Sequence, residues 1–263
     1  MDVIADTPLV VIFLISIVAL SAAAEIGHRL GLRVAGEAGV STLEAAMLGL
    51  LALMLSFTFA MAVARFDARR EAVLKEANAI GTAALRARLL PAPHDAESLR
   101  LLKDYVQIRL DITRRVPTPP ELDAAIARSN AIQERLWLEV KSAVAKDNAM
   151  VPTGLYVQAL NEMIDDQESR LTAFRNHVPN IVLPALYGIA MVGIGFAGYA
   201  GGIEKRRWRL PVYAMNVLAA SVILLIQDID RPSAGFISVS QQPMVDTANA
   251  IAGYGAECGS FIP

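Results

Sequence analysis

Four stretches of the chain are apolar, free of charged side chains and nearly long enough to cross a lipid bilayer. They cover residues 8–24, 45–63, 181–200 and 212–226. About 20 apolar residues in a helix are needed to span a hydrocarbon core of roughly 30 Å. The pattern therefore predicts four transmembrane helices, arranged as two pairs around a long central segment.

The first stretch has an alternative interpretation as a cleaved signal peptide, because three alanines precede Glu25 as they would at a cleavage site. A signal peptide, however, begins with Lys or Arg. Here the charged residues before the apolar run are Asp2 and Asp6. We therefore expect a retained membrane anchor.

The central segment follows the spacing of amphipathic helices. No glycine or proline interrupts residues 64–80, so the second transmembrane helix is expected to continue beyond the membrane until Pro91 and Pro93 end it. Apolar residues then recur every three or four positions in three further segments, which are 98–115, 121–146 and 153–175. Each such helix can bury one stripe against its neighbours.

These patterns predict an all-α integral membrane protein with an inserted helical domain outside the membrane. Composition agrees, because 54% of the 263 residues are hydrophobic and the mean hydropathy is +0.43, whereas a typical globular chain has roughly 45–50% apolar residues. Membrane lipid is therefore an expected partner. The expected order is transmembrane helices 1 and 2 in 1–63, a helical domain continuous with helix 2 in 64–177, transmembrane helices 3 and 4 in 178–232, and a C-terminal tail in 233–263.

Charge and metal-binding residues disfavour several classes of function. A formal net charge of −2 provides no basic surface for nucleic acid. Cys258 is the single cysteine, which excludes an internal disulfide, and no histidine has a second ligand at metal-binding spacing on its own helix. The chain also lacks the common nucleophile, phosphate-binding and zinc-protease motifs. We expect no metal site, no cofactor and no catalysis.

Basic residues in the short loops predict an orientation, because such loops stay on the cytoplasmic side. Arg29 and Arg33 lie between the first two spans, and residues 204–209 between the last two read Glu-Lys-Arg-Arg-Trp-Arg. The spans are then expected in the cell (inner) membrane, with the central domain outside the cytoplasm. The opposite orientation is favoured by basic residues just after the second span, namely Arg65, Arg69, Arg70 and Lys75. The short loops receive more weight because long domains translocate largely regardless of charge.

One face of the second span and its extension changes from apolar to charged along the helix. Its apolar part is Met54, Phe57, Met61 and Ala64, and its polar part is Glu71, Lys75 and Asn78. In a symmetric oligomer this face would line a pore with a dry hydrophobic constriction and a charged vestibule, which can gate by dewetting. The alternative is a face that packs against lipid or against other helices of the bundle.

A cluster of charged residues, Asp228, Asp230 and Arg231, lies where the fourth span leaves the bilayer. A structural salt bridge is the favoured interpretation of this cluster, ahead of ion coordination. An alternative enzymatic function would depend on the carboxylates of Asp228 and Asp230. Asn216, inside the same span, is expected to hydrogen-bond to a neighbouring helix.

The third span carries small residues at every fourth position, which are Gly193, Ala197 and Gly201. Small residues at this spacing allow two helix backbones to approach closely in lipid. We therefore expect another helix to pack against this stripe.

Several motifs along the chain are similar to those of one known family. They are Glu-Ala-Asn-Ala-Ile-Gly-Thr at 76–82 with Arg86, residues 160–165 with Arg170 and His-Val-Pro at 177–179, and Asp-Ile-Asp-Arg-Pro at 228–232 followed by Val239, Ser240 and Pro243. The chain resembles the bacterial bestrophin-like-domain family over nearly its whole length, and the motif at 228–232 is the most specific element of this resemblance.

The resemblance implies a homo-oligomeric ion channel for small inorganic ions. Members of that family are four-span membrane proteins proposed to be relatives of bestrophins, which are pentameric anion channels lined by their second span. The alternative is a non-conducting membrane sensor or scaffold whose extramembrane helices bind a partner. Oligomeric state distinguishes the two, since a stable ring favours the channel and a monomer or dimer favours the scaffold.

Overall fold

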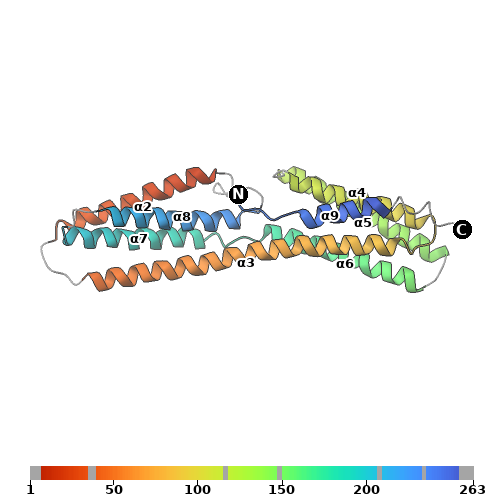
Figure 1. Cartoon of the computed structure of the whole chain (residues 1–263), viewed down its shortest axis with the longest axis horizontal. Helices are drawn as coiled ribbons and strands as arrows, with labels where there is room; N and C mark the ends of the chain where they lie inside the picture. Colours follow the sequence, from red (N-terminus) through yellow and green to blue (C-terminus); the bar gives the residue numbers. More distant parts are fainter. Residues whose placement is uncertain are drawn as a thin grey trace. The chain divides into compact units, whose positions relative to one another are not determined.

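The computed structural model describes residues 7–34, 40–114, 118–146, 150–205, 209–232 and 235–254. Within this part of the chain every regular element is a helix, which confirms the expected all-α fold (Figure 1). The helices are α2 (Leu9–Gly31), α3 (Ser41–Ala87), α4 (His94–Arg114), α5 (Pro119–Lys146), α6 (Met150–Arg175), α7 (Val182–Ile203), α8 (Leu210–Asp230) and α9 (Gln242–Tyr254).

Four of these helices, α2, α3, α7 and α8, are long and apolar enough to cross a membrane. They contain the four apolar stretches predicted from the sequence, so the prediction of four spans is confirmed. The helix α3 has 47 residues and continues well past the apolar stretch before it ends at Ala87, a few residues ahead of Pro91 and Pro93. The second span and its extension are therefore one helix.

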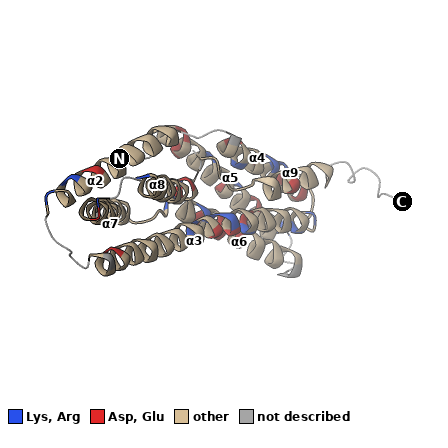
Figure 2. Ribbon diagram, turned by 60° about the vertical axis from the view of Figure 1, so that its left-hand side comes forward, with Lys and Arg blue, Asp and Glu red and all other residues tan. Residues whose placement is uncertain are grey.

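The chain divides into two compact units, each built from segments that are separated in the sequence. The first unit comprises Met1–Phe66 and His177–Ile237, and we call it the span unit. The second comprises Asp67–Asn176 and Ser238–Pro263, and we call it the helical unit. Most Lys, Arg, Asp and Glu residues lie on helices of the helical unit, whereas α7 and α8 are almost uncharged (Figure 2).

In the span unit α2 packs along α7, and α8 packs against both. Glycines allow the close approach of α2 and α7. A Cβ atom added to Gly27 would lie 1.9 Å from the carbonyl oxygen of Gly195, and one added to Gly198 would lie 2.1 Å from that of Ala24. Any side chain at these positions would push the two backbones apart.

This packing confirms only part of the small-residue stripe that was expected on the third span. The glycines of α7 that meet α2 are Gly195, Gly198 and Gly202. Gly193 instead faces α3, with its added Cβ 3.6 Å from the carbonyl oxygen of Met47, and nothing lies within 4 Å of a Cβ at Gly201. A helix therefore packs against Gly193, as expected, whereas the close approach to α2 uses other glycines of α7. Spacing alone did not identify them, because several small residues follow one another on this helix.

Buried polar side chains also join the spans. Asn216 is fully buried on α8, and its amide nitrogen lies 3.4 Å from the hydroxyl oxygen of Ser21 on α2. This contact confirms the expected hydrogen bond to a neighbouring helix. Elsewhere in the span unit, the hydroxyl groups of Ser16 on α2 and Tyr187 on α7 are 2.6 Å apart, and the amide of Gln227 on α8 donates to Tyr187. Such bonds satisfy polar groups that lipid could not.

The helical unit is a bundle of the second part of α3 with α4, α5, α6 and α9 around one apolar core. The three helices predicted at 98–115, 121–146 and 153–175 correspond to α4, α5 and α6, each of which begins a few residues earlier. Residues 233–263 were expected to form a tail, and α9 was not predicted. That helix packs against α4 and adds Met244, Ala248 and Ile251 to the core.

Candidate functional site

The predicted pore residues of α3 fall into two groups. Phe57 is 62% exposed and Ala64 is exposed in the single chain. Met54 and Met61 are half-buried, and they pack against the apolar core of the span unit. The two methionines thus border the exposed face of the helix, while Phe57 and Ala64 lie within it.

Exposed residues continue along α3 at a regular interval. Phe57, Ala64, Glu71 and Asn78 follow one another every seven residues, and all four are exposed. A seven-residue interval keeps the same face of a helix toward a partner when helices wind around each other with a left-handed supercoil. The same face includes further exposed residues, which are Leu53, Ala60, Asp67, Ala68, Leu74 and Lys75.

The predicted vestibule residues lie on the polar part of this face. Glu71 and Lys75 are exposed and form an ion pair with 2.8 Å between the carboxylate and the ammonium nitrogen. Asn78 is exposed one turn further along. An exposed pair at this spacing contributes little to stability, so these residues remain available for contacts with solvent, ions or another chain.

Asp228, the first residue of the predicted charge cluster, holds a connecting segment rather than a cation. Its carboxylate is almost fully buried and accepts backbone hydrogen bonds from the N–H groups of Phe236 and Ile237, at 2.7 and 3.1 Å. Gly235 lies directly against it, and a Cβ there would be 2.2 Å from a carboxylate oxygen. Asp228 therefore fixes the chain that follows α8.

Asp230 and Arg231 bind two other segments of the span unit. The carboxylate of Asp230 accepts a hydrogen bond of 2.9 Å from the backbone N–H of Val178, and it lies 3.6 Å from the imidazole of His177. Arg231 donates to the carbonyl oxygen of Thr7 at 2.9 Å. The cluster thus anchors the segments that precede α2 and α7 and follow α8, which gives the motif at 228–232 a structural role.

A buried charge cluster in the helical unit was not singled out as a site by the sequence analysis. The carboxylate of Glu76 on α3 is fully buried and pairs with two guanidinium groups. Its distances are 2.7 Å to Nε of Arg109 on α4 and 2.5 Å to Nη1 of Arg170 on α6. The hydroxyl oxygen of Tyr105 lies 3.2 Å from the same carboxylate. One carboxylate therefore joins three helices of the bundle.

Amide side chains extend this cluster. Tyr105 donates a shorter bond of 2.7 Å to Gln167, whose side chain also contacts Gln133 and Asn130, and Arg170 donates to Gln241 at the start of α9. Burial raises the pKa of Tyr105, and the negative charge of Glu76 raises it further. The phenol consequently stays protonated and acts as a donor.

Metal-binding groups do not gather in the described part of the chain. No set of three His, Cys, Asp or Glu side chains there is placed to hold a metal ion. His94 on α4 is buried, and its Nδ1 atom lies 2.7 Å from a carboxylate oxygen of Glu139 on α5. This histidine therefore joins two helices of the bundle.

Comparison with known proteins identifies relatives of this architecture. A family model described as the Bestrophin-like domain matches residues 11–244. No curated protein sequence matches the chain.

Solved structures share the fold. A crystal structure of a membrane protein carrying a proline-to-alanine substitution superposes with a TM-score of 0.63 at 17% identity, covering 97% of this chain and all of that one. A crystal structure of a bacterial bestrophin homologue from Klebsiella pneumoniae with a tryptophan-to-alanine substitution gives a TM-score of 0.63 at 15% identity, covering 92% and 93% of the two chains. At these identities the likeness concerns the fold alone.

Proposed function

Because the chain belongs to the family of proteins with a Bestrophin-like domain, we propose that it assembles into a homo-oligomeric ion channel whose pore is lined by α3. The family is of channel type, and the chain is a multi-pass membrane protein with the fold of a bacterial bestrophin homologue. The subunit number, the pore lining and the permeant ions are part of this proposal. A pentamer is the assembly implied by the family resemblance.

The exposed face of α3 is the observation that carries the proposal. A long helix that leaves one continuous face uncovered in the single chain requires lipid, solvent or further protein on that face. Phe57 belongs to the span unit, where lipid or protein can cover it, and Glu71 and Lys75 belong to the helical unit, which is expected outside the membrane. A water-filled axis shared by several copies of α3 accommodates both parts.

Such a pore would have two physically different sections. Phe57 supplies large apolar rings that narrow and dry the axis, and the methyl groups of Ala60 and Ala64 leave it wider. Beyond them, Glu71 and Lys75 offer charge of both signs to hydrated ions. A narrow apolar ring excludes water and ions until it widens, so the section at Phe57 is the proposed gate.

Planar-bilayer recording of the purified protein is the test, combined with its mass in detergent. The proposal predicts a stable ring of several copies and ion conductance after reconstitution. A monomer or dimer that shows no conductance under any ionic condition would contradict it. That outcome would support the alternative of a non-conducting sensor or scaffold.

We also propose that the helical unit lies outside the cytoplasm and the spans in the cell (inner) membrane. The support is the basic character of the short segments between spans, where Arg29, Arg33, Lys205 and Arg209 lie.

Cys258 is the single cysteine of the chain and provides a native label for the C-terminal end. A membrane-impermeant maleimide should label it in intact cells with a permeable outer layer. If the maleimide labels Cys258 only after the cells are lysed, this orientation is contradicted. The Cys258→Ser variant is the control and should stay unlabelled.

A further inference from the structure

An apolar groove runs between α2 and α7 in the span unit, where these two helices pack side by side (Figure 1). Its volume is about 470 Å³, and sites that hold small molecules have roughly 300–1,000 Å³. The two backbones touch at Gly27 and Gly195, which therefore form its floor. Its walls are exposed apolar side chains, which are Ile26, Leu30, Met191 and Val192.

The groove is suited to a hydrocarbon chain. Both helices are apolar enough to cross a membrane, so lipid has access to it. Its lining has no charged residue, and the phenol of Tyr199 is the polar side-chain group in it. Tyrosines are frequent at the level of the lipid headgroups. The groove therefore offers an apolar surface that ends near the headgroups.

Two cations, Arg33 and Lys205, lie at this end of the groove. A Cβ atom added to Gly31 would be 3.0 Å from both the Cα atom of Gly202 and the backbone nitrogen of Ile203, so the ends of α2 and α7 touch. Arg33 lies two residues beyond Gly31, and Lys205 lies two residues beyond Ile203. Two residues span at most about 7 Å, which keeps both cations close to the contact. Both are exposed, and the side chain of neither forms an ion pair or hydrogen bond within the described residues.

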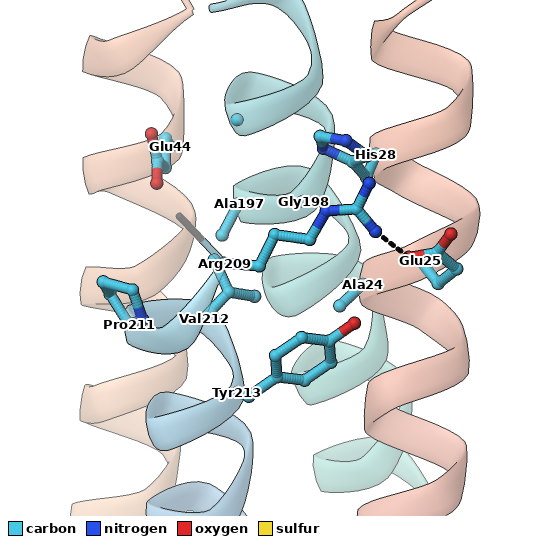
Figure 3. Close-up of a pocket in the computed structure, with 11 residues that line it drawn as sticks. Ala24, Glu25, His28, Glu44, Ala197, Gly198, Arg209, Pro211, Val212 and Tyr213 are labelled. Atoms are coloured by element: carbon cyan, nitrogen blue, oxygen red, sulfur yellow. Dashed lines mark hydrogen bonds and ion pairs between the residues drawn. The ribbon is translucent and has the colours of Figure 1, made fainter. Parts of the chain in front are cut away.

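The other cations of the described loop end are already paired. In the small pocket beside the start of α8, Arg209 donates to one carboxylate oxygen of Glu25 at 2.9 Å (Figure 3), and Arg29 donates to the other oxygen at 2.9 Å. Over residues 25–44 and 204–209 of the sequence the cations nevertheless outnumber the carboxylates. The cations are Arg29, Arg33, Lys205, Arg206, Arg207 and Arg209, and the carboxylates are Glu25, Glu37, Glu44 and Glu204. The loop end thus has an excess of positive charge.

From this arrangement we propose that α2 and α7 bind one anionic phospholipid, with an acyl chain in the groove and the phosphate beside Arg33 and Lys205. Guanidinium and ammonium groups both donate to phosphate oxygens, and basic residues next to a span attract anionic lipids. A zwitterionic lipid carries the same phosphate but no net charge, so it gains less from the positive excess. The inference requires the spans to lie in a membrane and does not depend on ion conduction.

The test is lipid-dependent thermal unfolding of the purified protein in detergent. Phosphatidylglycerol and phosphatidylethanolamine with the same acyl chains are added separately at equal concentration. Phosphatidylglycerol should raise the unfolding temperature more, because a ligand that binds only the native state stabilises it. Equal shifts, or a larger shift with phosphatidylethanolamine, would overturn the proposal. Glycerol 3-phosphate carries the phosphate without acyl chains, and an equal shift with it would overturn a lipid as the ligand.

Charge substitutions locate the phosphate. The double variant Arg33→Gln, Lys205→Gln should weaken the apparent affinity for phosphatidylglycerol at least ~5-fold, which is the effect of one Lys or Arg near an anionic membrane surface. The double variant Arg128→Gln, Lys141→Gln removes two exposed cations from α5 in the helical unit and is the matched control. It should leave the affinity unchanged. The same affinity in both double variants would contradict the assigned cations.

A bulky side chain in the groove tests the place of the acyl chain. Val192→Trp fills the groove without a change of charge and should also weaken the affinity for phosphatidylglycerol at least ~5-fold. Val18→Trp changes an exposed valine of α2 outside the groove and should leave it unchanged. Equal affinities of these two variants would rule out the groove. If Val192→Trp, unlike Val18→Trp, alters the mass of the assembly in detergent, the groove is a contact between copies and the lipid is overturned as its occupant.

Discussion

Glu76 places an ionised carboxylate in the middle of an apolar helical bundle. Burial of a charge costs several kcal/mol unless it is paired and hydrogen-bonded. Arg109, Arg170 and Tyr105 supply those partners, and Arg109 is itself only 3% exposed. Burial lowers the pKa of Arg170, whereas the negative charge of Glu76 acts in the opposite direction. The carboxylate and the two cations therefore depend on one another.

Replacement of Glu76 by Gln should destabilise the helical unit strongly. Two buried guanidinium groups would then face each other without a counter-ion, and removal of one partner of a buried pair costs about 3–5 kcal/mol. The check is thermal unfolding of the purified protein. Glu71→Gln is the matched control on the same helix, because its carboxylate is exposed, and it should leave the unfolding temperature unchanged. Equal effects of the two substitutions would contradict the account.

Asp166 on α6 provides a pH-dependent prediction. Burial raises the pKa of this carboxyl group, and the negative charge of Glu162 raises it further. Ionisation of Asp166 therefore costs stability at neutral pH, and the cost disappears as the pH falls through the raised pKa toward the ordinary value of about 3.9.

The substitution Asp166→Asn should thus stabilise the helical unit at pH 7 and make little difference near pH 3.5. Unfolding temperatures of the two proteins over this pH range measure the effect. Asp165→Asn removes an exposed carboxylate from the same turn and serves as the control. If the rise in unfolding temperature caused by Asp166→Asn does not become smaller as the pH falls, ionisation of Asp166 is not the cause of that rise.

At Phe57 the expected effect is on conduction. Phe57→Ala should widen the proposed hydrophobic constriction and raise the basal current several-fold in planar bilayers. Leu218→Ala, on an exposed position of α8 outside the proposed pore, is the control and should not change the current. No change in Phe57→Ala would indicate that this face packs against protein or lipid.

From the sequence it was possible to predict that Phe57, Glu71 and Asn78 share one face of α3, but not to predict the buried cluster around Glu76. Phe57, Glu71 and Asn78 were found because side chains on one helix face obey a fixed spacing. The partners of Glu76 come from other helices, and no local pattern relates position 76 to position 109 or 170. One signal was present, because Glu76 is followed by Ala77, Ala79 and Ile80, and a carboxylate among such residues on a buried face requires a partner.

At the scale of helices, the α2–α7 pair depends on glycine. In lipid, helix association relies on close packing and hydrogen bonds, because lipid tails are as apolar as the side chains. Gly27 on α2 and Gly198 on α7 bring the backbones together. Periodicity predicted both helices correctly, since long apolar runs have no other stable form in a bilayer. It could not determine which glycines face each other, because that depends on the rotation of each helix about its axis.

The packing predicts opposite effects for two neighbouring glycines. Gly198→Ala places a methyl group 2.1 Å from the carbonyl oxygen of Ala24 and should cost ~1–3 kcal/mol of stability by overpacking. Gly201→Ala meets nothing within 4 Å and should be neutral or slightly stabilising, because alanine favours a helix over glycine by up to ~1 kcal/mol. Thermal unfolding of both variants in detergent provides the comparison. A loss in Gly201→Ala as large as that in Gly198→Ala would contradict the assigned interface.

In the whole molecule, the two units alternate along the sequence. Each unit is built from two chain segments, and a segment of the other unit lies between them in the sequence. The sequence predicted the two pairs of spans and the inserted helices, because hydropathy separates lipid-facing from water-facing segments directly. It did not predict that α9 would complete the core of the helical unit. The helix is short, and its three core residues, Met244, Ala248 and Ile251, are few. Its place in the bundle is specified by contacts with distant helices.

The proposed channel is an assembly in which α3 from several copies surrounds a pore. The most direct measurement is the modification of single cysteines during planar-bilayer recording, in a Cys258→Ser background. A charged thiosulfonate reagent should reduce the current through Ala64→Cys channels and should leave Ala214→Cys channels unaffected, since Ala214 is exposed on α8, a helix outside the proposed pore lining. The account would be contradicted if the reagent reduced the current of Ala214→Cys channels but not that of Ala64→Cys channels, or if no current were observed at all.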